Sequence, residues 1–166
     1  MILPTLRASF GRLDAQNLVS LLGRDDPTLR EGALERLDSQ GLDALLDDPR
    51  TLNALLSDPD ASARPEVVFY VLVRQSLLEA GIKDRAAADY VATLLVTFGS
   101  GDRAYRVSGE SAERYRYLVD VVERLRGAQA REAFLLQAHL GNFSLWLTGL
   151  FPDYLEARGR RRGAPG

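Results

Sequence analysis

Three segments in the first third of the chain repeat one pattern, a leucine-rich stretch that is followed by an aspartate and a proline. Residues 42–49 read LDALLDDP, residues 52–59 read LNALLSDP, and residues 18–27 form a looser copy. Leucines at this spacing lie on one face of a helix. An aspartate caps the N-terminus of a helix, and proline is well tolerated at its first position. The pattern therefore predicts short helices that stack on one another.

Helix start and stop signals recur along the whole chain. The segment after Pro65 is apolar on almost every side, so we expect this helix at the centre of the fold. No stretch alternates apolar and polar residues with the two-residue period of a strand. The sequence therefore predicts an all-α protein of about eight helices. The expected starts are Asp14, Asp26, Asp48, Pro65 and Asp84, and the expected stops are Gly23, Gly81, Gly99, Gly127 and Gly141.

Aromatic residues are distributed unevenly along the chain. None lies between Phe10 and Phe69, and the later ones all fall between Phe69 and Tyr154. Large rings dominate protein cores. We therefore expect residues 65–158 to build the main core, with residues 1–64 as a layer of short helices packed on it.

The length of 166 residues is typical of one domain. We expect residues 1–158 to form a single helical domain. Residues 159–166 are rich in arginine and glycine and are expected to form a flexible basic tail.

Composition excludes several kinds of site and partner. The chain has no cysteine, which excludes disulfides, thiol catalysis and thiolate metal sites. Its net charge of −2 favours neither nucleic acid nor a membrane as a partner. The N-terminus lacks the apolar core of a signal peptide, and the longest apolar run, residues 67–73, is too short to span a bilayer. We therefore expect a cytoplasmic protein. All basic residues except Lys83 are arginines, as is typical of a GC-rich bacterial genome.

Residues 18–37 resemble one HEAT-type helical repeat. Each repeat of that family has a leucine-rich helix, an Asp-Pro turn, and a second helix with a Leu-Arg pair near its start. In this chain the turn is Asp26-Pro27 and the pair is Leu29-Arg30. The resemblance extends over about residues 18–56. The later copies lie only 10 residues apart, whereas HEAT repeats are about 40 residues long. The resemblance implies a stacked helix pair, which any leucine-rich helix pair with an Asp-Pro turn would also form.

The leucines of the repeated pattern form the motif Leu-x-x-Leu-Leu three times, at residues 18–22, 42–46 and 52–56. Helices with this pattern can dock in a groove of a partner protein. The spacing is also that of a stripe that faces the core of its own domain, and we favour this interpretation.

Arg74 interrupts the most apolar helix. A buried arginine must be paired, and Glu79, Asp89 and Asp120 are candidate partners. We expect Arg74 to anchor neighbouring helices. The alternative is that it binds an anion or a carboxylate in a cavity between helices.

A second candidate site follows the only histidine, His139. We expect Gly141 to end one helix and Asn142 to begin the next, with His139 capping the first. The only tryptophan, Trp146, and Tyr154 follow closely, and rings with polar tips are suited to binding sites. The alternative is a packed helical corner in which these residues are structural.

No pattern of catalytic or metal-binding residues stands out. A single histidine cannot supply the usual zinc ligands. The adjacent carboxylates at 25–26 and at 47–48 each precede a proline, so helix capping explains them without a metal. The glycine-rich segment 99–102 lacks the lysine of a phosphate loop. We therefore predict no catalytic residues, no metal and no cofactor.

Two functions remain open on the sequence. The first is a non-enzymatic helical interaction or regulatory module with a protein partner or with self-association. The second is a small-molecule-binding helical protein, which includes the case of an enzyme. Its cavity would lie near four residues from separate predicted helices, which are Arg74, Tyr117, His139 and Trp146.

Overall fold

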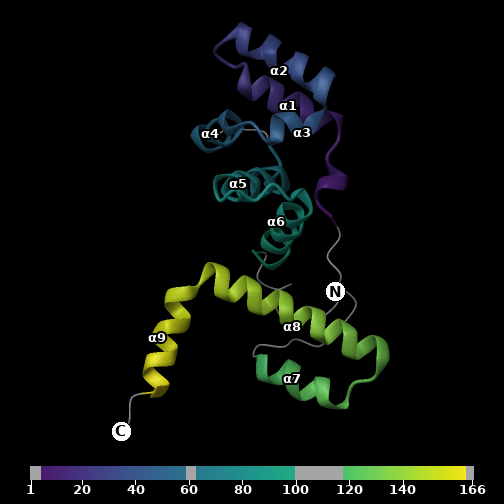
Figure 1. The fold of residues 1–166 in the computed structure, drawn as a ribbon, viewed down its shortest axis with the longest axis vertical. Coiled ribbons are helices and arrows are strands. Elements are labelled where there is room, and N and C mark those ends of the chain that lie inside the picture. Colours follow the sequence, from purple (N-terminus) through teal and green to yellow (C-terminus); the bar gives the residue numbers. More distant parts are fainter. Residues whose placement is uncertain (1–4, 59–62, 100–117, 164–166) are drawn as a thin grey trace. The chain divides into compact units, whose positions relative to one another are not determined.

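The computed structural model describes residues 5–58, 63–99 and 118–163, and within these ranges every regular element is a helix (Figure 1). The predicted all-α class is therefore confirmed. The helix that ends at the predicted stop Gly127 is described from Leu118 onward. The elements are η1 Arg7–Ser9, α1 Arg12–Leu22, α2 Pro27–Gln40, α3 Leu42–Leu46, α4 Pro49–Ser57, α5 Pro65–Glu79, α6 Arg85–Gly99, α7 Leu118–Gly127, α8 Ala130–Leu150 and α9 Pro152–Gly163.

The chain divides into two compact units, each held together by its own internal contacts. Residues 4–96 form the N-terminal unit, and residues from 97 onward form most of the C-terminal unit. The boundary lies within α6 and not at the change in aromatic content near residue 64. Each unit is described by itself below.

Aspartates or prolines start α2, α4, α5 and α6 as the sequence predicts. The Asp26 carboxylate accepts a hydrogen bond from the backbone N–H of Thr28 at 2.8 Å, and that of Asp84 accepts one from Ala86 at 2.8 Å. Pro27, Pro49 and Pro65 each occupy the first turn of a helix. These carboxylates satisfy N–H groups that have no partner within the helix.

The prediction that Asp14 precedes and caps the first helix was wrong. α1 begins at Arg12, so Asp14 lies in the first turn and does not precede the helix. Its carboxylate accepts a hydrogen bond from the backbone N–H of Gly11 at 2.9 Å. A carboxylate at the third position of a helix can reach back to the N-cap residue in this way.

The core of the N-terminal unit joins the short helices to α5 and the first part of α6. α5 contributes four buried apolar side chains to this core, more than any other helix, which are Val67, Tyr70, Val71 and Val73. The ring of Phe10 lies edge-on against that of Tyr70, with the centroids 5.5 Å apart. Four leucines of the repeated pattern belong to the same cluster, which confirms that these stripes face the core. They are Leu18, Leu45, Leu46 and Leu55.

Two glycines make the sharp turns that this packing needs. Gly41 has φ of 78° between α2 and α3, and Gly81 has φ of 77° after α5. This left-handed region is readily accessible only to glycine. The turn at Gly41 allows α3 to begin immediately after α2, and the turn at Gly81 lies in the short connection between α5 and α6.

The C-terminal unit contains α7 and α8, which pack against each other, followed by α9. The predicted helix break at Gly141 was wrong, because α8 runs without interruption from Ala130 to Leu150. A glycine inside a helix costs only about 1 kcal/mol. Leu136, His139 and Phe143 are buried on one face of α8, and their spacing continues across Gly141. Burial of that face therefore outweighs the local stop signal.

The arginine-rich end of the chain is helical as far as Gly163, in α9. Arg160 is exposed and pairs with Glu156 one turn earlier, at 2.9 Å. The flexibility predicted for residues 159–166 stays a prediction, and residues 164–166 lie outside the described ranges. In the part of the chain that the structure describes, no helix is long and apolar enough to cross a membrane.

Candidate functional site

Two adjacent aspartates at the junction of α3 and α4 organise the charged side chains of the N-terminal unit. Asp48 caps α4, because its Oδ1 accepts a hydrogen bond from the backbone N–H of Arg50 at 2.9 Å. The Arg50 guanidinium also binds the Asp48 carboxylate, with Nη2 2.7 Å from Oδ2. Arg36, from α2, donates from Nη1 to the same Oδ2. Asp48 therefore links α2 to the start of α4.

Asp47 links the junction of α3 and α4 to α5 and α6. Its Oδ1 accepts a hydrogen bond from Arg74 Nε at 2.7 Å, and its Oδ2 accepts from Arg74 Nη2 at 3.1 Å and from Arg85 Nη2 at 2.6 Å. Arg74 also donates from Nη1 to the carbonyl of Lys83 at 2.9 Å. Arg74 is only 3% exposed. The prediction that it anchors helices is therefore supported by its contacts.

The predicted partners of Arg74 were wrong. Arg74 pairs with Asp47, not with Glu79, Asp89 or Asp120. Asp89 instead accepts a hydrogen bond from the backbone N–H of Arg7 at 2.9 Å. Asp47 was assigned to helix capping, but Asp48 alone caps α4, so Asp47 is available to pair across the unit.

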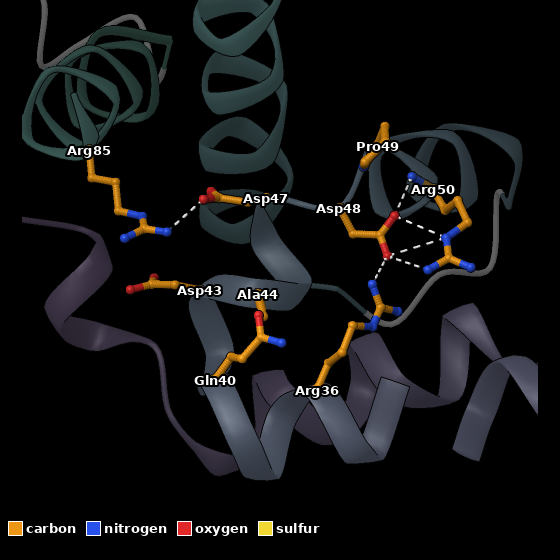
Figure 2. A pocket seen from close by; sticks show the side chains of 9 residues that line it. All are labelled: Arg36, Gln40, Asp43, Ala44, Asp47, Asp48, Pro49, Arg50 and Arg85. Carbon is orange, nitrogen blue, oxygen red and sulfur yellow. Dashed lines mark hydrogen bonds and ion pairs between the residues drawn. The ribbon is translucent and has the colours of Figure 1, made fainter. Parts of the chain in front are cut away.

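The junction of α3 and α4, with Asp47 and Asp48, lies at an open depression of about 570 Å³ on the N-terminal unit (Figure 2). Arg36 and Arg50 lie together around Asp48, and Arg85 faces Asp47 from α6. The side chain of Gln40 lies between these two groups. The lining consists of Arg36, Gln40, Asp43, Ala44, Asp47, Asp48, Pro49, Arg50 and Arg85.

The lining of the depression has three arginines and three aspartates, and two further arginines, Arg7 and Arg74, pair with these aspartates from outside the lining. Asp43 pairs with Arg7 at 2.7 Å, which adds a third carboxylate and a fifth guanidinium to the pairs of Asp47 and Asp48. The network thus carries a surplus of two positive charges. The Arg50 and Arg85 side chains are each 52% exposed, so part of each guanidinium meets solvent.

The carboxylates of the network are held in their ionised form. Burial alone would raise the pKa of Asp48, but hydrogen bonds from Arg50 and Arg36 outweigh it and hold that pKa well below its usual value. Burial would also raise the pKa of Asp47, but hydrogen bonds from Arg74 and Arg85 outweigh this effect. The pKa of Asp47 is therefore lowered as well. Both oxygens of each carboxylate accept hydrogen bonds from arginine.

The described arginines retain hydrogen-bond donors that these contacts do not use. Arg85 binds its partner through Nη2 alone, which leaves Nε and Nη1. Arg50 leaves Nη1, and Arg36 leaves Nη2. A guanidinium has five N–H donors and accepts no hydrogen bond. The available chemistry of the depression is therefore donation to an anion.

The C-terminal unit has a different cluster, which is made of rings. His139 stacks on Phe143 with centroids 6.1 Å apart, and Phe98 lies 5.9 Å from the centroid of His139 and 6.0 Å from that of Trp146. Phe151 lies against Trp146 at 5.2 Å. His139 is 2% exposed, and burial lowers its pKa to about 4. The imidazole is therefore neutral near pH 7, and it lies inside α8 and not at the end of a helix, where it was expected as a cap.

Two polar atoms of this cluster are buried without a hydrogen-bond partner among the described residues. They are Nδ1 of His139 and Nε1 of Trp146. Buried polar atoms are usually satisfied, so each unpaired one calls for a physical explanation. The ring packing of the cluster supplies no acceptor or donor for either atom.

The candidate residues from the sequence lie in different parts of the structure. Arg74 lies in the ion-pair network of the N-terminal unit, whereas His139 and Trp146 lie in the ring cluster. Asn142 is buried in α8, and Tyr154 is exposed on α9. Tyr117 lies outside the described residues. The sequence analysis missed Arg36, Arg50 and Arg85, which line the depression.

Comparison with protein-family models, with curated proteins and with solved structures gives no significant match. Among the residues that the structure describes, no group of three histidine, cysteine or acidic side chains is placed to hold a metal ion.

Proposed function

We propose that this chain is a non-enzymatic helical interaction module and that the arginine-lined depression of its N-terminal unit binds an acidic segment of a partner protein. One observation carries the proposal. Arg36, Arg50 and Arg85 border an open depression and keep unused donors, while both oxygens of Asp47 and of Asp48 already accept hydrogen bonds from arginine. Arginine is well suited to contacts with carboxylates and phosphates at interfaces.

The chemistry of the lining favours binding over catalysis. A general base must be able to take up a proton near the working pH. Asp47 and Asp48 have lowered pKa values and are fully hydrogen-bonded, so neither is suited to that task. The remaining side chains of the lining are arginine, glutamine, alanine, proline and the paired Asp43.

The arrangement of helices is also compatible with an interaction module. α1 and α2 pack against each other across the Asp26-Pro27 turn, as the resemblance to a HEAT-type repeat implies. α3 and α4 continue the stack. The depression lies where α2, α3, α4 and α6 supply side chains, so a partner would contact several helices at once.

The proposal is tested with an array of synthetic peptides. Acidic peptides are compared with neutral peptides of the same length, and the probe is the full chain. The key variants are Arg50→Gln and Arg85→Gln, because Asp48 keeps Arg36 and Asp47 keeps Arg74 in them. The control is Arg12→Gln, which removes the same charge from an exposed side chain that does not line the depression.

We expect the wild-type chain to bind acidic peptides and to release them as salt rises, because exposed charge pairs are screened. Each key variant should weaken binding about tenfold, which is typical of the loss of one charge-assisted contact. The control should bind like the wild type. Binding that does not favour acidic peptides, or that the key variants leave unchanged, would refute the proposal.

A second candidate function is the binding of a small molecule at the ring cluster of the C-terminal unit. The unpaired Nδ1 of His139 and Nε1 of Trp146 favour it, because a ligand could hydrogen-bond with both atoms. Thermal-shift measurements against a metabolite library, combined with Trp146 fluorescence, test this candidate. A ligand at the cluster should change both signals, and His139→Gln should abolish the response.

A further inference from the structure

We infer that one face of the C-terminal helix α9 docks the chain on the surface of an anionic lipid bilayer. This face belongs to the C-terminal unit and shares no residue with the lining of the arginine-lined depression, so the inference is independent of the proposed function. It follows from the helical register of α9, from the separation of its charges, and from the exposure of its rings.

The register of α9 is set by its first turn. The backbone N–H of Leu155 donates a hydrogen bond to the carbonyl of Phe151 at 3.2 Å, so the helical spacing starts at Phe151. Residues three and four positions apart lie on the same face of a helix. One face of α9, which we call the basic stripe, therefore combines two aromatic residues and a leucine with three arginines. Its members are Phe151, Tyr154, Leu155, Arg158, Arg161 and Arg162.

The acidic residues of α9 lie on the opposite face. Asp153, Glu156 and Arg160 follow one another at the same helical spacing. Arg160 pairs with Glu156 at 2.9 Å, so the acidic face has its own cation. The basic stripe has no acidic member, and its three arginines give it a formal charge of +3. The net charge of −2 for the whole chain, which favours no membrane, therefore does not describe this face.

The rings of the basic stripe are exposed beside these arginines. Phe151 is 43% exposed and Tyr154 is 53% exposed, and Leu150 at the end of α8 is exposed as well. Phe151 also contacts Trp146, with the ring centroids 5.2 Å apart, so the exposed rings continue the ring cluster of the C-terminal unit. Exposed apolar groups that adjoin one another mark surfaces for a partner or a membrane. Whatever this face contacts must offer anionic and apolar groups together.

An anionic bilayer offers both kinds of group over its whole surface. Its phosphates attract arginine, and aromatic rings are favoured at the level of the headgroups. From Phe151 to Arg162 the basic stripe is about 17 Å long, so a helix that lies flat on the bilayer brings its rings and its arginines to the surface at once. Single-stranded nucleic acid would also match arginines and rings, but it has no apolar layer for the leucines.

The experiment measures co-sedimentation of the full chain with lipid vesicles at physiological ionic strength. Vesicles of phosphatidylcholine alone are compared with vesicles that also contain phosphatidylglycerol, which supplies the negative charge. We expect binding to the anionic vesicles, and binding to the neutral vesicles that is at least about tenfold weaker. Binding should weaken as the salt concentration rises. Equal binding to both kinds of vesicle, or binding to neither, would refute the inference.

Two arginines of α9 provide matched variants. Arg162→Gln removes one charge from the basic stripe, and Arg160→Gln removes the same charge two positions away on the opposite face. We expect Arg162→Gln to weaken binding to anionic vesicles about fivefold, and the double variant that adds Arg158→Gln to weaken it about 25-fold. Arg160→Gln should change binding less than about twofold, because the opposite face lies about one Debye length from the surface. Equal effects of the two single substitutions would contradict docking through this face.

The contribution of the rings is tested by a second matched pair. Tyr154→Ser removes an exposed ring from the basic stripe and should weaken vesicle binding at least about threefold. Tyr90→Ser removes a tyrosine of similar exposure from α6 and should leave binding unchanged. Far-ultraviolet circular dichroism verifies that each variant is folded. If Tyr154→Ser binds like the wild type, the rings do not enter the bilayer and the inference fails.

Two other kinds of partner are outcomes of the same experiment. If the chain binds an oligonucleotide and not the anionic vesicles, the basic stripe recognises nucleic acid. If vesicle binding depends on Arg50 and not on Arg162, the depression is the surface that contacts lipid, and the inference is wrong. Arg162→Gln should leave the binding of acidic peptides unchanged, so this inference and the proposed function can fail separately.

Discussion

Arg74 donates two hydrogen bonds to the carboxylate of Asp47, from Nε to Oδ1 at 2.7 Å and from Nη2 to Oδ2 at 3.1 Å. The two residues are 27 positions apart in the sequence. The pair joins α5 to the junction of α3 and α4. The Arg74 side chain is buried, whereas Asp47 is partly exposed and also binds Arg85. Asp47 is therefore both a structural anchor and a support for the depression.

Asp47→Ala should lower the free energy of unfolding by roughly 3 kcal/mol, because it leaves the buried Arg74 guanidinium without its carboxylate. Urea denaturation followed by circular dichroism measures the change. Asp25→Ala is the matched control, since Asp25 is exposed and outside the network, and its effect should stay within about 0.5 kcal/mol. Equal effects of the two substitutions would show that the pair does not anchor α5.

His139 should make the C-terminal unit less stable as the pH falls from about 6.5 to about 4. Its pKa is lowered to about 4 in the folded chain from 6.5 in the unfolded chain, so the unfolded chain binds more protons between these values. The loss should approach about 3 kcal/mol at the lower end. Fluorescence of Trp146 during urea denaturation, measured across this pH range, follows the unit.

His139→Gln provides the control for this pH dependence. Glutamine does not titrate, so the slope between pH 6.5 and pH 4 should disappear even if the variant is less stable at every pH. Asp47 and Asp48 belong to the N-terminal unit and make a separate contribution. Their folded pKa values are lowered, so the stability that they contribute starts to fall only at the lower end of this window and is lost mainly below the ordinary aspartate pKa of 3.8. A slope that persists in the variant would contradict the assignment.

Gly23→Ala should destabilise the N-terminal unit by about 1–3 kcal/mol. A Cβ at this position would overlap the Arg30 Cβ and lie 2.6 Å from the Arg30 Cα, so the backbone of α2 would have to move. Gly32→Ala is the matched control. A Cβ at Gly32 meets no atom within 4 Å, and alanine should stabilise α2 by about 0.5–1 kcal/mol. Thermal denaturation of the two variants should therefore shift in opposite directions.

Truncation after Arg158 should leave the melting temperature nearly unchanged. Arg160 is exposed and makes an ion pair with Glu156 of the same helix, and such surface pairs contribute less than about 1 kcal/mol. Calorimetry of the truncated and full chains measures the difference. A fall of many degrees would mean that the end of α9 packs against another surface.

The sequence identified helix starts well, because the capping signals act within one turn. Asp26, Asp48 and Asp84 each accept backbone hydrogen bonds two residues ahead. The leucine stripes were also assigned correctly to the core, since the spacing of one helix face depends only on helix geometry. Local chemistry of this kind needs no knowledge of the tertiary structure.

Local signals failed where burial competes with them. Gly141 and Asn142 have the composition of a helix end, yet α8 continues through both. The buried face that includes His139 and Phe143 spans this point, and the packing of that face exceeds the small cost of a glycine within a helix. For the same reason His139 is a buried neutral side chain and not an exposed cap.

The sequence by itself determined the all-α class, the short helices of the first third and the residues that begin them, because these depend on interactions within a few positions. Only the tertiary structure decided that Asp47 pairs with Arg74 and Arg85 and that Arg36 and Arg50 meet at Asp48. Adjacent aspartates before a proline look alike in sequence, whether both cap a helix or one reaches across the fold. The depression exists because α2, α4 and α6 bring arginines from distant positions to one surface, and no local pattern specifies that meeting.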